Sequence, residues 1–131
     1  MTPFNFRIHP ERLAIARLEP DAPLPDWARG KFLNIARTPG ELSIVSAQRH
    51  VPAAVVQVRE KIALFIEGTV PMTAVGIIAS LSRALADAQV PIFVIATYDT
   101  DWILVGVDRF EAARAALESQ GHRVSGELPL T

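Results

Sequence analysis

The hydrophobic pattern in the first half of the chain predicts short strands and little helix. Apolar runs of strand length recur, and the last of them alternates apolar and polar residues. Between the second and third runs, Thr38-Pro39-Gly40-Glu41 has proline and glycine at the central positions of a type II turn, which predicts a hairpin. The proline-rich segment Pro20–Asp26 leaves room for only a turn or two of helix, at Trp27–Gly30. The predicted strands are Leu13–Glu19, Phe32–Arg37, Leu42–Ala47 and Val55–Arg59.

The second half repeats this order with longer helices. A strand at Ile62–Ile66 is followed by a loop and by a helix that Thr73 can cap, with apolar residues at spacings of three, four and seven. A second hairpin follows, and Asp108 and Glu111 then resemble a capping box at the start of a second helix. The remaining expected features are inner-face residues Ile77, Ile78, Leu81 and Leu85 in the first helix, hairpin strands Ile92–Thr97 and Trp102–Val107, inner-face residues Phe110, Ala113 and Leu117 in the second helix, its stop at Gly121, and a last edge strand at Val124.

The two hairpins align with an offset of 60 positions, for example Ile35 with Ile95 and Glu41 with Asp101, which indicates a weak internal repeat. Each half reads strand, helix, strand, strand, helix, strand, which is the ferredoxin-like order. We therefore expect an α+β fold of two ferredoxin-like βαββαβ units with their sheets side by side. The boundaries are an N-terminal tail at 1–11, an abbreviated unit at 12–60 and a complete unit at 61–127.

Composition narrows the classes of function. The 131 residues are 50% hydrophobic and 21% charged, a composition that excludes an intrinsically disordered chain. It also suggests that some apolar surface binds a partner, most simply a second copy of the chain. The formal net charge of −1 gives no footprint for nucleic acid. The chain has no cysteine, which removes disulfides and thiol nucleophiles and is compatible with a reducing compartment. No apolar run approaches the ~20 residues of a membrane span, so we expect a soluble, cytoplasmic protein.

Two places could bind a small ligand. The turn at Tyr98–Asp101 carries two carboxylates, and an ammonium group could bind there, although such residues are also ordinary turn formers. The loop Val70–Gly76 enters a helix, whose free N–H groups suit a carboxylate, although Gly76 could equally serve tight packing. Together the two places match the two charged ends of a free amino acid.

No arrangement of residues predicts catalysis. The three histidines are scattered and are interpreted as surface residues, and the pseudo-equivalent Glu41 and Asp101 have no nucleophile or metal set nearby. No phosphate-binding glycine pattern occurs, so no cofactor is expected. We expect that the protein is not an enzyme and has no metal site. The histidines are His9, His50 and His122.

Three segments resemble a known family. The runs Glu41–Ser46, Gly76–Ala86 and Ile92–Val105 resemble the small bacterial tandem ACT proteins, which are related to the CASTOR arginine sensors and to aspartokinase regulatory domains. The resemblance covers about residues 12 to 125. It implies two ACT units, a non-catalytic regulatory role, amino-acid binding at the interface between the units, and a homodimer. The alternative is an ACT protein that has lost its ligand and acts as an interaction or structural protein through dimerisation.

The resemblance also implies the ligand contacts. Asp101 would bind the ligand ammonium, and N–H groups of Met72–Gly76 would bind its carboxylate. The arginine sensors have an acidic residue where this chain has Ala74, so the ligand implied is a smaller or an apolar amino acid. The ligand-binding residues predicted in this way are Ser43, Ile44, Pro71, Met72, Ala74, Gly76, Thr97, Tyr98, Thr100 and Asp101.

Overall fold

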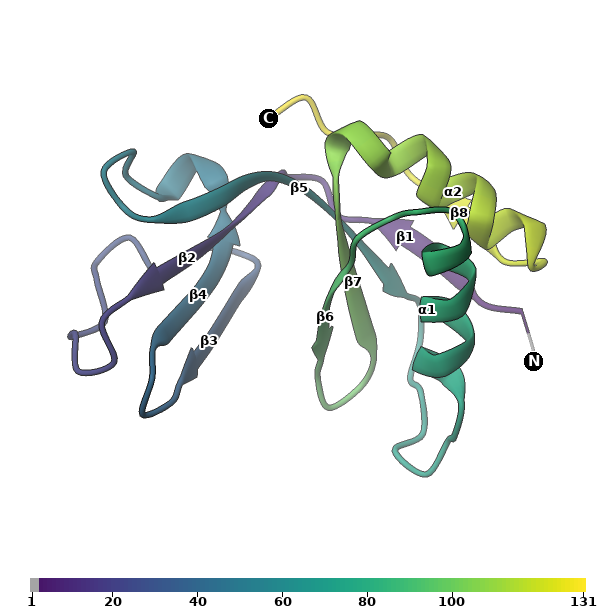
Figure 1. The fold of residues 1–131 in the computed structure, drawn as a ribbon, viewed down its shortest axis with the longest axis horizontal. Coiled ribbons are helices and arrows are strands. Elements are labelled where there is room, and N and C mark those ends of the chain that lie inside the picture. Colours follow the sequence, from purple (N-terminus) through teal and green to yellow (C-terminus); the bar gives the residue numbers. More distant parts are fainter. Residues whose placement is uncertain (1–2) are drawn as a thin grey trace. The chain divides into compact units, whose positions relative to one another are not determined.

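The computed structural model describes residues 3–131, which form two compact units. We call the unit formed by the described residues up to Pro10 together with Ile62–Pro129 the helical unit, and the unit formed by Glu11–Lys61 and Leu130–Thr131 the sheet unit. Figure 1 labels the helices and strands of both. The predicted α+β fold of two ferredoxin-like units, the first of them abbreviated, is confirmed.

The sheet unit is an antiparallel sheet in the order β3-β4-β2-β5. The predicted hairpin is present, with Arg37 opposite Leu42 as its last pair. Its turn is not type II, because Gly40 does not have the positive φ that a type II turn requires. Residues Trp27–Gly30 contain no helix, because Trp27 lies in a turn and the rest of the segment is irregular. The strands are β2 (Leu13–Leu18), β3 (Leu33–Arg37), β4 (Leu42–Ala47) and β5 (Gln57–Ile66), and a 3₁₀ turn, η1 (Gln48–His50), follows β4.

Strand β5 corrects the prediction of two separate strands at Val55–Arg59 and Ile62–Ile66. The backbone continues as one strand through Glu60, which has a φ of 61°. The pairing of β2 with β5 shifts register at this point, as a β-bulge does. The side chain of Gln48 accepts a hydrogen bond from the Glu60 N–H at 2.8 Å and donates one to the Glu60 carboxylate at 3.0 Å. Arg12 also donates to that carboxylate, so side-chain contacts hold a conformation that alternation alone cannot reveal.

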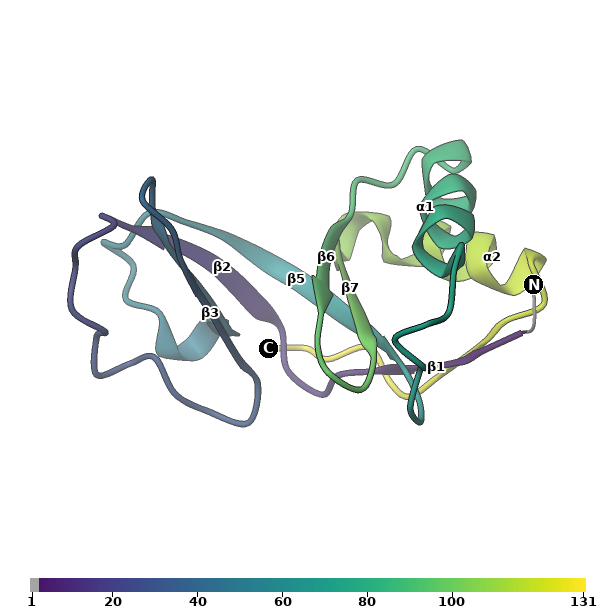
Figure 2. The same cartoon turned by 90° about the horizontal axis from the view of Figure 1, so that it is seen from below.

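The helical unit has its strands in the order β6-β7-β5-β1-β8. Residues 1–11 were predicted to be a tail, but Asn5–Ile8 forms β1, which pairs antiparallel with β5 and parallel with β8. The predicted last strand is therefore an edge strand beside β1. Figures 1 and 2 show both helices on one face of these strands. The elements are β1 (Asn5–Ile8), α1 (Ile77–Asp87), β6 (Phe93–Ala96), β7 (Asp101–Gly106), the 3₁₀ turn η2 (Val107–Arg109), α2 (Phe110–Ser119) and β8 (Arg123–Ser125).

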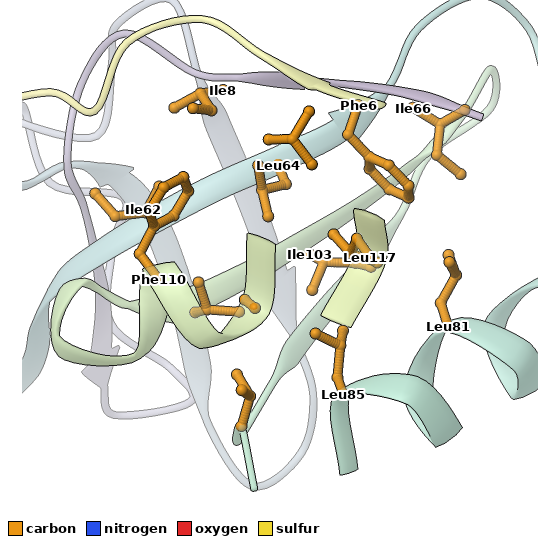
Figure 3. Close-up of a cluster of buried hydrophobic side chains, with 14 residues drawn as sticks. Phe6, Ile8, Ile62, Leu64, Ile66, Leu81, Leu85, Ile103, Phe110 and Leu117 are labelled. Atoms are coloured by element: carbon orange, nitrogen blue, oxygen red, sulfur yellow. The ribbon is translucent and has the colours of Figure 1, made fainter. Parts of the chain in front are cut away.

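The core of the helical unit lies between this sheet and the two helices. Leu81 and Leu85 of α1 are fully buried, as are the three predicted inner-face residues of α2. Figure 3 shows them meeting side chains of β1, β5 and β7. Burying a side chain of this size contributes roughly 1.5–3 kcal/mol, so β1 is held by its own core residues Phe6 and Ile8 as well as by its ladder. Gly121 ends the α2 segment at a φ of 88°, as predicted.

The helix starts differ from the predictions. Helix α1 begins at Ile77 with Gly76 as its N-cap residue, so Thr73 lies too far upstream to cap it. Helix α2 has Arg109 as its N-cap residue and no side-chain cap, so the expected capping box of Asp108 and Glu111 is not formed. The 3₁₀ turn η2 that precedes α2 shifts the cap position by one residue.

The interpretation of the histidines as surface residues was wrong. His9 and His122 are buried, and His50 is half-buried. The N–H of Phe4 donates to Nδ1 of His122 at 2.9 Å, and the rings of Phe4 and Phe6 lie 5.8 and 5.5 Å from the His122 ring. Burial lowers the pKa of His122. The His122 side chain thus helps to hold β1 and the residue before it in place, through its contacts with Phe4 and Phe6.

The two hairpins correspond with an offset of 59 rather than 60. Each has a four-residue turn that begins with threonine, Thr38 in one and Thr97 in the other. In each the threonine N–H donates to the carbonyl of the fourth turn residue at 2.9 Å. Asp101 is therefore the first residue after its turn, whereas Glu41 is the last residue inside its own.

Candidate functional site

A cavity of about 410 Å³ opens in the helical unit between the start of α1 and the β6–β7 turn. Cavities of roughly 300–1,000 Å³ are typical of small-molecule sites. Eight of the ten predicted ligand-binding residues line it, although they come from segments about 25 residues apart in the chain. The lining residues are Val70, Pro71, Met72, Ala74, Gly76, Ile77, Ile78, Ala79, Ala96, Thr97, Tyr98, Thr100 and Asp101.

The β6–β7 turn is tied down by its own hydroxyl groups. Thr97 Oγ1 donates to the Thr100 carbonyl at 2.9 Å, and Thr100 Oγ1 donates to the Ile66 carbonyl at 2.7 Å. The Val70 N–H donates to the Asp99 carbonyl at 2.7 Å, which joins the turn to the loop before α1. Both hydroxyl protons are thus already used, so towards a ligand these two threonines offer acceptor oxygens.

The start of α1 supplies the donors. Gly76 has a φ of 79°, and no side chain caps the helix. The first three N–H groups of a helix have no acceptor within it, and the first intrahelical bond here is from Ser80 to the Gly76 carbonyl at 3.0 Å. A side chain at position 76 would meet nothing within 4 Å, so the space beside these N–H groups is open. The N–H groups and the positive end of the helix dipole together favour an anionic group at this end of the cavity.

Asp101 gives the cavity its charge. It is the single ionisable carboxylate among the lining residues, and no lysine, arginine or histidine lines the cavity. None of the ion pairs found among the described residues includes it. Because Asp101 pairs with Ala96 at the first rung of the hairpin, the strand ladder fixes its backbone at the rim of the turn. Asp101 can therefore accept hydrogen bonds from a cation, and the N–H groups at the start of α1 can donate them to an anion in the same cavity.

Ser43 and Ile44 lie elsewhere, on β4 of the sheet unit. Ile44 is fully buried, and Ser43 is half-buried opposite Arg17 and Ala36. Neither is among the lining residues of this cavity. Their part in ligand binding stays a prediction.

Five of the lining residues are absent from the predicted ligand-binding residues, although one of them, Val70, lies in the loop that was predicted to bind a ligand. Ile77 and Ile78 were expected only as inner-face residues of the helix, and both are half-buried with part of their surface towards the cavity. A helix beginning at Gly76 puts its first turn into the site, and recognition of Gly76 as the N-cap residue would have indicated this. The unassigned residues are Val70, Ile77, Ile78, Ala79 and Ala96.

Two other kinds of site are absent from residues 3–131, the part of the chain that the structure describes. No group of three or more histidine, aspartate or glutamate residues there could hold a metal ion. No helix in that part of the chain is long and apolar enough to cross a membrane.

A family model for the ACT domain matches residues 58–119, which include the whole lining of the cavity. Residues 58–119 of this chain therefore form an ACT domain. A second family model, which describes an N-terminal domain, matches residues 11–54. The matched ACT segment starts within β5 and ends at the end of α2, so the ACT domain is the part of the helical unit that carries the candidate site.

The ACT domain is part of a longer similarity, because solved structures resemble the chain over both units. A protein from Agobacterium tumefaciens is 28% identical, with a TM-score of 0.91 over 100% of this chain and 99% of its own. A Vibrio cholerae protein of unknown function, described as a possible transport protein, is 21% identical, with a TM-score of 0.69 over 88% of each chain. The regulatory subunit of aspartate kinase from Thermus thermophilus, in a ligand-free form, is 14% identical, with a TM-score of 0.61 over 87% of this chain and 95% of its own. The last two similarities show the fold alone. None of the curated proteins compared matches the sequence significantly.

Proposed function

We propose that this protein is a small, non-catalytic regulatory protein that binds a free amino acid or a similar zwitterion in the cavity of its ACT domain. One observation carries the proposal: Asp101 and the uncapped start of α1 line the same cavity. An α-amino acid bears an ammonium and a carboxylate on one carbon atom, and the cavity offers a group of opposite charge character for each. The fold similarity to an aspartate kinase regulatory subunit supports a regulatory role.

In this proposal the ligand ammonium donates hydrogen bonds to Asp101, and the ligand carboxylate accepts them from the N–H groups of Ile77, Ile78 and Ala79. A hydrogen bond to a charged group contributes on the order of 1.5–3 kcal/mol. The acceptor oxygens of Thr97 and Thr100 complete the ammonium end. Gly76 adopts the left-handed φ of 79° at which α1 begins, a conformation that a residue with a Cβ rarely takes.

The proposal is tested by calorimetric titration of the common amino acids into the full chain. Asp101→Asn keeps the size of the side chain and removes its charge, so we expect the Kd of the bound amino acid to rise tenfold or more. Asp99→Asn is the matched control, because it removes one charge from the same turn at a residue that does not line the cavity. Its Kd should stay within about twofold of the parent value, since the hydrogen bond from Val70 uses only the Asp99 backbone.

Two results would contradict the proposal. If no amino acid binds to the parent protein, the regulatory ligand is not an amino acid. If Asp101→Asn and Asp99→Asn bind equally well, Asp101 is not part of the site. An amino acid amide, which lacks the carboxylate, tests the other end of the cavity and should bind more weakly than the parent amino acid.

The exposed edge of the ACT domain favours a second candidate function, interaction through a homodimer. Strand β6 pairs only with β7 among the described strands, and its Phe93 and Val94 are more than one-third exposed. An apolar edge strand is a template for pairing with another chain. Sedimentation analysis should detect a dimer of the parent, and Val94→Lys should shift it towards the monomer. A monomeric parent would remove this candidate.

We further propose a cytoplasmic location, which fits the cysteine-free sequence and which cell fractionation would check.

A further inference from the structure

Part of the cavity wall consists of apolar side chains that the hydrophobic core does not bury completely. Val70, Ile77 and Ile78 are only half-buried, although each also packs against the core or belongs to the helix that covers it. Met72, at the rim, is 74% exposed. Apolar surface that faces a cavity and remains in contact with water gains free energy when a ligand covers it. We call Val70, Met72, Ile77 and Ile78 the apolar wall.

Charge at the site excludes whole classes of ligand side chain. An acidic side chain would add a second negative charge near Asp101, and no cationic side chain lines the cavity to compensate it. A basic side chain has no second carboxylate available, so it would compete with the ligand's own ammonium for Asp101. A charge moved out of water without a partner costs free energy. Of the amino acids, those with uncharged apolar side chains satisfy the site best.

We propose that the ligand of this site is an amino acid with an aliphatic side chain, of the size of valine, leucine or isoleucine, and that its side chain packs against the apolar wall. This inference rests on the proposed function, because it needs the ammonium and the carboxylate to be held as described there. It adds the chemical class of the side chain and names Met72 as a residue that determines specificity.

The first test is a calorimetric series of glycine, alanine, valine and leucine, with lysine and glutamate for comparison. Each methylene that becomes buried against the wall should increase the affinity about fourfold, so leucine should bind at least tenfold more tightly than alanine. Lysine and glutamate should bind more weakly than leucine. A flat series, or tighter binding of lysine or glutamate, would overturn the aliphatic assignment while leaving amino-acid binding intact. Failure of every amino acid to bind would overturn both proposals.

The second test uses a matched pair of variants in the loop before α1. Met72→Glu introduces a charge into the apolar wall, whereas Val75→Glu makes the same change at a residue that is 91% exposed and does not line the cavity. Both side chains are exposed, so neither change should lower the melting temperature of the unliganded protein by more than about 2 °C. The Kd for leucine should rise about tenfold in Met72→Glu and stay unchanged in Val75→Glu. Equal Kd values for the two variants would overturn the role of Met72.

Discussion

The two hairpins of this protein have the same kind of four-residue turn, but only the turn in the helical unit contributes residues to the lining of the 410 Å³ cavity. In both, a threonine N–H and hydroxyl close a four-residue turn. In the sheet unit the hairpin is tied to the preceding segment by Arg37, which donates to the carbonyls of Pro20 and Ala22. In the helical unit the tie is the bond from Val70 to Asp99, and the chain continues into α1. A turn thus becomes part of a candidate site through the element beside it, which is a helix start in the helical unit and a proline-rich loop in the sheet unit.

The largest expected difference between the units is in their stability. Phe110→Ala removes a fully buried ring from the core of the helical unit and should cost about 3–5 kcal/mol of unfolding free energy. Val51→Ala removes two methyl groups from the smaller cluster that Val51 forms with Ala14 and Ala16, and should cost about 2 kcal/mol. Urea denaturation of both variants measures the two values. A greater loss for Val51→Ala would reverse this part of the comparison.

A smaller effect on the free energy of unfolding is expected from replacing one glycine in each unit, Gly76 in the helical unit and Gly40 in the sheet unit. Gly76 has a positive φ, so Gly76→Ala should cost about 1–2 kcal/mol even though the added methyl group meets no neighbour. Gly40 lacks a positive φ, and its nearest neighbour would be Thr38 Oγ1 at 3.9 Å, so Gly40→Ala should be close to neutral. Thermal unfolding of the pair measures the difference. Equal stabilities would show that the left-handed conformation at Gly76 is not needed to start α1.

Variants of the two turn threonines, Thr97 and Thr38, distinguish an effect on stability from an effect on ligand affinity. Both hydroxyls donate to the carbonyl of the fourth turn residue, and Thr38 Oγ1 accepts from the Gly40 and Glu41 N–H groups, whereas Thr97 Oγ1 accepts from the Thr100 N–H. Thr97→Val and Thr38→Val should each cost about 0.5–1.5 kcal/mol. Only Thr97→Val should also weaken amino-acid binding, because only Thr97 lines the cavity. Titration of both variants with leucine checks this. If Thr38→Val weakens binding as much as Thr97→Val does, the two turns do not differ in the proposed way.

The smallest expected effect is a difference in response to acid. Burial lowers the pKa of His122 from its ordinary value of 6.5, so the unfolded chain binds the proton more readily and the helical unit loses stability as the pH falls below about 6.5. In the sheet unit, hydrogen bonds from Arg12 and Gln48 lower the pKa of Glu60 from its ordinary value of 4.5. That contribution is present above about pH 4.5 and is lost only below it.

Hydrogen exchange at pH 7.5 and 5.5 can follow the two units separately. Protection should fall in β1 and β8 but not in β2 and β4. His122→Asn keeps an acceptor for the Phe4 N–H and does not titrate, so it should remove the pH dependence. A pH dependence that persists in this variant would show that another group is responsible.

Hydrophobic periodicity and turn residues made the helices and the hairpins predictable, and the resemblance to ACT proteins made most of the candidate site predictable. The helical spacing of Leu81 and Leu85 identified the buried face of α1, and the resemblance to ACT proteins indicated both segments of the cavity lining. Residues 5–8 were missed as a strand because four alternating residues beside prolines give too weak a pattern. Their pairing with β5 and β8 depends on contacts more than 50 residues away.

The continuity of β5 and the start of α1 could not be predicted for a different reason. Each depends on one residue at positive φ, Glu60 or Gly76, and the conformation is set by neighbours distant in sequence or by the absence of a side chain. The one-residue error in the repeat has a similar origin. Matching residue types favoured an offset of 60, but the hydrogen bonds of the two threonine turns fix it at 59.

The most direct test of the central claim is a backbone NMR titration of the full chain with leucine. The account predicts that the amide signals of Ile77, Ile78 and Asp101 shift with ligand concentration, while those of Thr38 and Glu41 in the matching turn do not. Shifts confined to the sheet unit, or no shifts at saturating leucine, would contradict the assignment of the site to the ACT domain cavity.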